Sequence, residues 1–422
     1  MNKIKLKKYF HYFFLYCTVS YGGMALPSYI GGNERFSIMM FLISIIIIII
    51  IKSKLYIKIR IQYFIFIILL LLLLSVFTTS TLSIGSIYTI ISTLIVVYSS
   101  YIYNPFKYLQ RILLISFILA IISIILFSMQ SFIGAYTLGN IMPFSHPIII
   151  NNKLEGFHSL YYNVSILHMG RNCGPFGEPG QYQIMLCTAL YFTLFKEQLY
   201  EKKMKIWYII FFFIALITTM STSGYLALFI LIFCYYLYTI TNTKRIDKKT
   251  ITVFKYIVLL STIFFFLTKT GQDFFQTAII QKIDMKKTGL AIFSNSSGSA
   301  RTISIENYIN AIYSDPTILW GIGFDEMQKK GIVIDGAVGF INLLGAIGLI
   351  PFIFLFYFCC NRNIKYSNSK WESCCCILLF INASLGQPHI INPLLFSMFL
   401  FTYFYKNTPI HKKIKINDER FS

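Results

Sequence analysis

Apolar residues run along the chain in long blocks, with short polar segments between them. A helix crosses a bilayer with roughly 17–25 such residues. Twelve blocks of about this length lie at 9–30, 36–51, 62–80, 84–103, 112–133, 179–195, 206–220, 222–240, 251–268, 337–360, 373–387 and 389–405. Backbone polar groups in lipid must be satisfied within the protein, so the pattern predicts an all-α polytopic membrane protein with about twelve transmembrane helices.

The composition agrees with that fold class. Of the 422 residues, 56% are hydrophobic and 18% are aromatic, while only 13% are charged. A soluble domain has about 25% charged residues. So little polar surface excludes a soluble enzyme, a disordered chain and a secreted disulfide scaffold.

The positive charge of the chain marks its topology. Lys and Arg number 37 against 16 Asp and Glu, which gives a net charge of +21. If the N-terminus is cytoplasmic, the segments on that side hold 27 of these cations and 6 of the acids, and the outer segments are neutral. This distribution follows the positive-inside rule. It predicts a bacterial cytoplasmic (inner) membrane protein with both termini cytoplasmic, and the charge no longer points to nucleic acid as a partner.

Two outer segments, 134–178 and 269–336, are far longer than the other connections within what we interpret as one polytopic domain, 1–422. Long polar loops on one face of a lipid-embedded chain are where binding and chemistry are expected. The nine cysteines show no CxxC or His/Cys ligand spacing, so no metal and no cofactor is predicted.

The first loop ends in the densest polar cluster of the chain, at 170–182. Several Gly and Pro residues there predict a tight turn, and Pro179 fits the first position of a helix. Glu178 then stands at the helix N-terminus, where a carboxylate is favoured. Two interpretations stay open for each charged residue. Glu178 acts in chemistry or only caps the helix, and Arg171 binds an anion or only reaches toward headgroups.

The second loop contains an amphipathic stretch. Ile305, Tyr308, Ile309 and Ile312 recur at helical spacing, Ser297 supplies a start and Asp315-Pro316 a stop. Such a helix would lie at the membrane surface with Arg301 near its N-terminus, either as part of a site or as a plain interfacial anchor.

Polar residues inside the predicted spans are few. They include the Ser/Thr run at 218–223, Asn342, Asn382 and the turn at 387–389. Side chains of this kind either have a function or form hydrogen bonds between helices. For the Ser/Thr run, hydrogen bonds between helices are the better interpretation. No predicted span carries an acid or a Lys well inside the bilayer, which counts against an ion-coupled pump.

Two arginines on two loops of one face suggest a doubly charged anion, because arginine binds phosphate bidentately and stays charged. At a membrane surface, the simplest such anion is a lipid pyrophosphate. A sugar leaving that group needs cations to hold it and one base to deprotonate the acceptor hydroxyl.

Over residues 165–355 the chain resembles the bacterial O-antigen and capsule repeat-unit polymerases (Wzy-type), which are related to the O-antigen ligases. The resemblance rests on a mid-chain loop with Arg171 and FGEPGQ at 176–181, the Thr/Ser/Gly run at 219–224, SGSAR at 297–301, GIGFDE at 321–326 and the glycine-containing segment at 345–350. It implies a membrane glycosyltransferase that joins undecaprenyl-pyrophosphate-linked oligosaccharide repeat units, as donor and acceptor, on the outer membrane face. Membrane lipid and a chain-length regulator protein are the implied partners.

The resemblance also implies roles for residues. Arg171 and Arg301 would hold pyrophosphate, and Glu178 ranks first as the base among the carboxylates. The implied substrate-binding residues are Gly177, Gln181, Tyr182, Trp320, Asp325, Asp335 and Asn342, of which Tyr182 and Trp320 would stack on sugar rings.

Three alternatives stay open. An O-antigen ligase uses the same donor, but ligases carry a His where this chain has Ile341, next to Asn342. A flippase of lipid-linked oligosaccharide would place cations in a central cavity, whereas these spans are nearly free of charge. A structural scaffold would not need arginines beside a shaped Gly/Pro turn.

Overall fold

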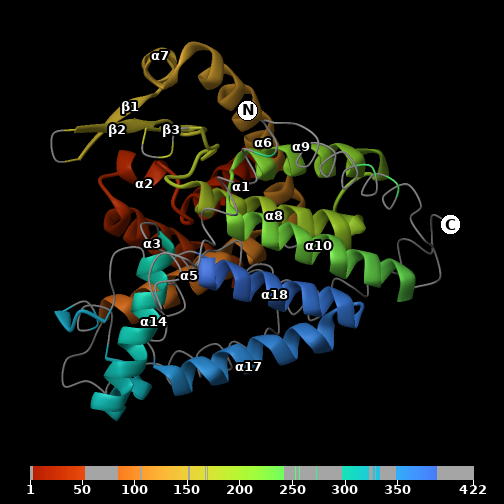
Figure 1. Ribbon diagram of the computed structural model, residues 1–422. Coiled ribbons are helices and arrows are strands. Elements are labelled where there is room, and N and C mark those ends of the chain that lie inside the picture. The colour runs from red at the N-terminus through yellow and green to blue at the C-terminus, as the bar shows by residue number, and fades with distance from the viewer. Residues whose placement is uncertain are drawn as a thin grey trace.

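The computed structural model describes residues 3–52, 84–104, 107–150, 153–166, 168, 170–241, 252, 256, 272, 297–322, 327, 329–332 and 348–386. The described chain is mostly helical (Figure 1). The N-terminal half contains α1 (Lys3–Ser20), α2 (Leu26–Tyr29), α3 (Asn33–Lys52), α5 (Ile84–Tyr103), α6 (Tyr108–Ile133), α7 (Ala135–Ile141), β1 (His146–Ile150), β2 (Lys153–His158) and β3 (Asn163–Ser165). The remainder contains α8 (Pro179–Phe195), η1 (Glu197–Leu199), η2 (Lys202–Met204), α9 (Lys205–Thr218), α10 (Thr222–Thr241), α14 (Ser297–Ser314), η4 (Pro316–Trp320), α17 (Leu349–Tyr366) and α18 (Lys370–Gly386).

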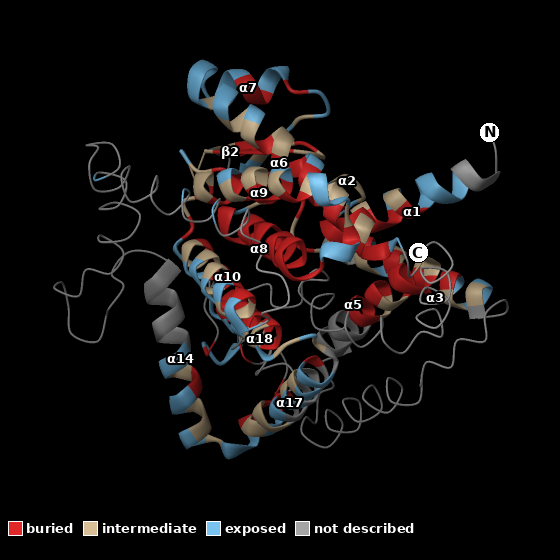
Figure 2. Cartoon of the chain, turned by 90° about the vertical axis from the view of Figure 1, so that its right-hand side faces the viewer, coloured by how far each residue is buried: buried red, intermediate tan, exposed pale blue. Residues whose placement is uncertain are grey.

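Helix α8 is the centre of the packing. All of its 17 residues are buried, and Figure 2 shows it red along its length. It contacts α6, α9, α10 and α18. A helix that is apolar on every side must be covered on every side, and these four neighbours cover it.

Two of the described helices are long and apolar enough to cross a membrane, Tyr108–Ile133 and Thr222–Thr241. A shorter apolar stretch, Arg35–Ile51, lies within α3. The blocks at 62–80 and 389–405, and all but two residues of the block at 251–268, lie outside the described residues.

Several helix bounds lie close to the predicted blocks. The prediction for 179–195 coincides with α8, and 222–240 ends one residue short of α10. The first block was wrong in its extent, because α1 ends at Ser20 and a separate short α2 follows. The chain turns at Gly23, whose φ of +106° suits glycine and not a helix.

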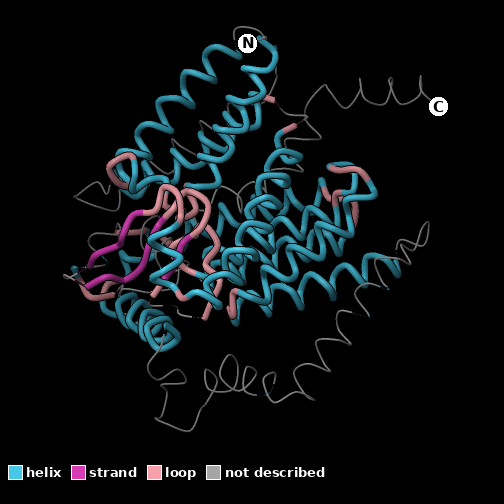
Figure 3. Tube along the Cα trace, turned by 90° about the horizontal axis from the view of Figure 1, so that it is seen from above, coloured by secondary structure: helices cyan, strands magenta, loops and turns pink. Residues whose placement is uncertain are grey.

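A small antiparallel sheet, in the order β1-β2-β3, lies within the predicted first loop (Figure 3). Its strands were not predicted. Helix α7 packs on the sheet through Leu138 and Met142, which contact Phe157, Tyr162 and Val164 in one apolar cluster. The contact is close at Gly139, where a Cβ would lie 2.2 Å from the Phe157 ring.

The amphipathic stretch in the second loop forms α14 with the predicted ends. Asp315 stops it, and its side chain accepts a hydrogen bond from Thr317 N at the start of η4. The predicted apolar face is only half covered, since Tyr308 is buried in the core while Ile305 and Ile309 are exposed.

Candidate functional site

The turn at 170–178 joins the sheet to α8 and is tied to the end of α9. Asn172 makes this tie, and its exposed fraction is zero. Its Nδ2 donates to Thr218 Oγ1 at 2.9 Å, and its backbone N donates to Thr218 O at 2.9 Å. Its Oδ1 accepts from Gly174 N at 2.9 Å. One buried amide therefore fixes the turn against both its own backbone and a neighbouring helix.

Tyr182 packs against the turn at Gly174. Its exposed fraction is zero, and its hydroxyl shares a 2.6 Å hydrogen bond with Ser123 of α6. A Cβ on Gly174, whose φ is +53°, would lie 2.6 Å from the Tyr182 ring. This packing leaves no ring face for a sugar, so Tyr182 does not have the stacking geometry that the resemblance implied. It holds the shape of the turn instead.

The segment around Gly177 packs against the turn that follows α1. Gly177 N donates to Gly23 O at 3.1 Å, and Met24 pairs with Phe176 as an antiparallel bridge. Gln181 lies over Gly23, where a Cβ would be 2.4 Å from Gln181 Oε1. Gln181 is 6% exposed, and its Oε1 has no hydrogen-bond partner among the described residues. The side chain of Gln181 is thus enclosed by its packing on Gly23.

Arg171 belongs to this turn and is half-buried. Its Nε donates to Thr219 O at 3.2 Å, which anchors the side chain to the residue after α9. Burial lowers the pKa of Arg171, but a guanidinium keeps its charge at any ordinary pH. Among the described residues its guanidinium bonds through Nε alone, so both terminal NH2 groups can meet a bidentate anion.

Glu178 occupies the N-cap position of α8, with φ −135° and ψ 147°. Its backbone O accepts from Gln181 N and Tyr182 N, each at 3.2 Å. Its side chain makes no capping hydrogen bond and is exposed. The carboxylate is close enough to Arg171 to raise the pKa of that residue against the larger effect of burial. Glu178 thus ends the turn with its carboxylate on the surface near a guanidinium.

His168 belongs to the same cluster, and the sequence interpretation missed it. Its backbone O accepts from Arg171 N at 3.1 Å, and its own N donates to Ser165 Oγ, at 3.2 Å. Burial, and then the charge of Arg171, lower the pKa of His168 from 6.5, while Glu178 acts in the opposite direction. A neutral imidazole is a proton acceptor. Its spacing of three residues from Arg171 within one Gly-rich segment was the available signal.

The predicted residues of the second loop are not joined to this cluster in the described structure. Arg301 lies in the first turns of α14, where the backbone is described. Trp320 ends η4 and is 41% exposed. Asp325, Asp335 and Asn342 lie outside the described residues.

Just inside the turn, a polar contact joins α8, α10 and α18. Asn382 Nδ2 donates to Ser223 O at 2.8 Å, and Gln183 Nε2 donates to Ser223 Oγ at 3.3 Å. A small cavity beside them is lined by Gln183, Thr188, Asn382 and apolar neighbours. In the positions described, Asn382 and Ser223 form hydrogen bonds between helices, which is one of the two interpretations that the sequence left open.

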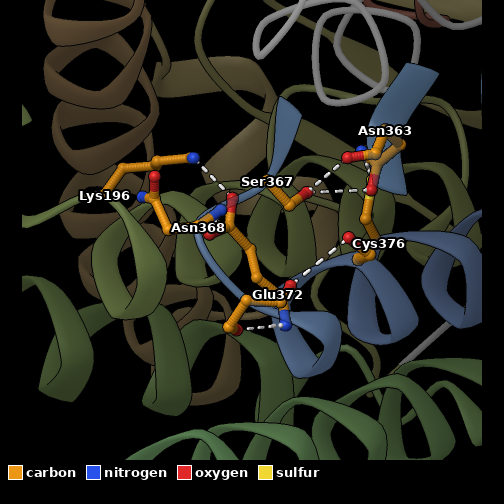
Figure 4. A network of polar contacts seen from close by, with 8 residues as sticks. Lys196, Asn363, Ser367, Asn368, Glu372 and Cys376 are labelled. Carbon is orange, nitrogen blue, oxygen red and sulfur yellow. Dashed lines mark hydrogen bonds and ion pairs between the residues drawn. The ribbon is translucent and has the colours of Figure 1, made fainter. Parts of the chain in front are cut away.

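A second polar network lies at the opposite end of α8 (Figure 4). Lys196 forms an ion pair with Glu372, and the two side chains are 3% and 0% exposed. Glu372 also accepts from Asn368 N at 3.1 Å. Asn363 of α17 donates to Cys376 Sγ at 3.2 Å. This network ties the C-terminal end of α8 to the first turn of α18.

The described residues contain no group of three or more His, Cys, Asp or Glu side chains that could hold a metal ion. Burial raises the pKa of the Cys173 thiol, inside the turn, to about 12. That thiol is not ionised near neutral pH and is not a nucleophile. Among the described residues, Arg171, Glu178 and His168 bring a guanidinium, a carboxylate and an imidazole to the turn. The chain matches no family model, no curated protein and no solved structure.

Proposed function

We propose that the chain is a multi-pass membrane glycosyltransferase with about twelve spans and cytoplasmic termini. It would polymerise surface polysaccharide by joining undecaprenyl-pyrophosphate-linked repeat units on the outer face of the bacterial cytoplasmic membrane. The observation that carries the proposal is Arg171, a half-buried guanidinium that is anchored through Nε to Thr219 O and has no partner at its two terminal NH2 groups among the described residues.

The contacts between helix ends support the topology of this proposal. Charged helix ends meet at one side: Lys196 of α8 pairs with Glu372 of α18, and Lys205 of α9 pairs with Glu197. At the other side, the C-terminal part of α18 meets the start of α10, where Asn382 donates to Ser223 O. Opposite ends of neighbouring helices meet in these contacts, as they do in spans that alternate in direction across a membrane.

The reaction would need few groups. The hydroxyl of the acceptor sugar attacks the anomeric carbon of the donor, and the bond from that carbon to the pyrophosphate oxygen breaks. Arg171 would stabilise the negative charge that grows on the departing pyrophosphate. Glu178 or His168 would take the proton of the attacking hydroxyl. Both interact electrostatically with Arg171, since Glu178 raises the pKa of Arg171 and Arg171 lowers the pKa of His168.

Genetic replacement in the native strain tests the proposal. The gene is deleted and complemented with the parent chain, with Arg171→Ala, or with Lys153→Ala, which removes an exposed cation of the same loop. The surface polysaccharide is then separated on a gel. We expect deletion and Arg171→Ala to leave single repeat units without a ladder, and Lys153→Ala to restore the ladder.

The other outcomes contradict the proposal in distinct ways. Loss of all repeat units from the surface after deletion would indicate a ligase or a flippase. An intact ladder after deletion would exclude every polysaccharide role. A full ladder with Arg171→Ala would remove Arg171 from the site.

A further inference from the structure

An exposed apolar surface covers the end of α6, helix α7 and the turn after it. It consists of Phe132, Ile133, Tyr136, Ile141 and Phe144, and we call it the α7 surface. Phe132 is 89% exposed and Phe144 is 72% exposed. Figure 2 shows α7 pale blue along most of its length, apart from the part that rests on the sheet. Large apolar side chains grouped in this way mark an interaction site.

The chemistry of the surrounding chain is unusual for a surface in water. Residues 112–152 contain no Asp, Glu, Lys or Arg, although 134–152 lie in the predicted outer loop. The polar side chains there are uncharged, as in Thr137 and Asn140. Interfaces between proteins usually have a polar rim with charged groups. An uncharged surface rich in aromatic residues suits the boundary between headgroups and acyl chains.

The turn that presents Phe144 is held in a strained conformation. Phe144 has a φ of +56°, in the left-handed region that residues other than glycine rarely occupy. Two tyrosine hydroxyls hold it, since Tyr29 donates to Phe144 O at 2.5 Å and Tyr161 donates to Pro143 O at 3.0 Å. Strain of this kind persists where the surrounding structure imposes it, and it often marks a functional position. Here the strain directs an aromatic ring away from the protein.

The α7 surface continues the exposed side of a helix that is long and apolar enough to cross a membrane. On α6, Ile118, Ile125 and Met129 are exposed ahead of Phe132. At Gly134, with φ +84°, the chain leaves α6 and enters α7 directly. The same lipid that covers α6 therefore reaches α7 without interruption.

We propose that the α7 surface inserts into the outer leaflet, at the boundary between headgroups and acyl chains. This inference rests on the membrane placement in the proposed function and not on glycosyl transfer. Insertion to a depth of about 5–10 Å is typical of amphipathic elements at this boundary. Since α7 packs on the sheet and β3 leads to Arg171, the anchor would hold the turn at 170–178 at the level of the lipid phosphates.

Fluorescence quenching in vesicles tests the inference without any substrate. The native Trp207, Trp320 and Trp371 are replaced by Phe in the full chain, and one Trp is introduced by Phe144→Trp. Phe229→Trp, on the exposed side of α10, is the control for lipid contact, and Lys203→Trp is the control for water. Each variant is placed in phosphatidylethanolamine–phosphatidylglycerol vesicles whose acyl chains are brominated near the headgroup or near the chain end.

We expect Phe144→Trp to lose most of its emission with the shallow bromines and less with the deep ones. Phe229→Trp should be quenched by lipid, and Lys203→Trp should be quenched only by aqueous iodide. Quenching of Phe144→Trp by iodide and not by brominated lipid would overturn the inference. So would a Phe144→Trp signal that shifts to the blue only in native membranes, which would indicate a protein partner. If Phe229→Trp also failed to be quenched by lipid, the membrane placement itself would be wrong, whatever the polysaccharide assay gives.

Discussion

Lys196 at the end of α8 and Glu372 in the first turn of α18 form an ion pair from which water is almost entirely excluded. Breaking such a pair leaves one buried charge without a partner. We expect Glu372→Ala to destabilise the protein by about 3–5 kcal/mol, measured by thermal unfolding in detergent. Replacing both residues with Met should recover most of the loss, because no isolated charge remains.

The exposed pair Lys203–Glu201 is the matched control for that experiment, since its side chains are 78% and 72% exposed. Glu201→Ala should leave the unfolding temperature nearly unchanged. Equal effects of Glu201→Ala and Glu372→Ala would contradict the importance of burial.

The guanidinium of Arg171 offers two parallel donors, which an ammonium group does not. We therefore expect Arg171→Lys to lower the rate of polymer formation by about 100-fold, the typical effect of losing one donor to a developing anion. The rate is measured with purified lipid-linked repeat units in vesicles. A rate close to that of the parent chain would show that charge alone is enough, and the bidentate contact would be excluded.

Substitution of Gly174 and of Gly170 by Ala distinguishes two destabilising effects in the turn, which are the strain of a left-handed backbone and steric overlap with a neighbouring side chain. Both have a positive φ, but only Gly174 faces the Tyr182 ring, whereas nothing lies within 4 Å of a Cβ at Gly170. Gly170→Ala should cost about 1–2 kcal/mol, the penalty of a left-handed backbone. Gly174→Ala should lower the unfolding temperature clearly more, because the added Cβ overlaps the ring. Equal shifts would mean that Tyr182 moves aside at no cost.

The lowered pKa of His168 predicts a dependence of stability on pH. The unfolded chain has a pKa near 6.5 at this residue, and burial and Arg171 place the folded value below it. Between the two values the unfolded state binds more protons, so stability is complete above pH 6.5 and falls as the pH drops toward the folded value. His168→Gln should reduce this fall in unfolding temperature between about pH 7.5 and about pH 5. His158, whose pKa is also lowered by burial, is common to both proteins. An unchanged fall would mean that His168 is solvated.

The ends of helices could be predicted wherever a residue type forces them. Pro179 starts α8 and Asp315-Pro316 ends α14, because proline fixes φ and lacks a donor. The break after Ser20 was missed, since Gly22 and Gly23 stand in an apolar block and only the packing of Gln181 on Gly23 shows why the chain must turn there. The strands of the sheet were missed because the isoleucines at 148–150 show no alternation of apolar and polar residues.

The candidate site could be predicted in part for the same reason. A polar cluster in an apolar chain identified Arg171, Glu178 and the glycines between them. Sequence cannot show which of its aromatic and amide side chains point inward, so Tyr182 was expected at the surface although Ser123 and Gly174 hold it in the core. His168 was missed because its relation to Glu178 depends on how the turn folds back.

The length of α8 has a consequence for the bilayer thickness that the proposed function requires. Its 17 residues rise about 25 Å at ~1.5 Å per residue, while the hydrocarbon core of a bilayer is about 30 Å thick. Contacts of Lys196 at one end of α8 and of the turn at 170–178 at the other end set the distance between these two ends. In the proposed function the headgroups must come down to Arg171, so a membrane of long acyl chains would carry the pyrophosphate out of reach and slow the reaction.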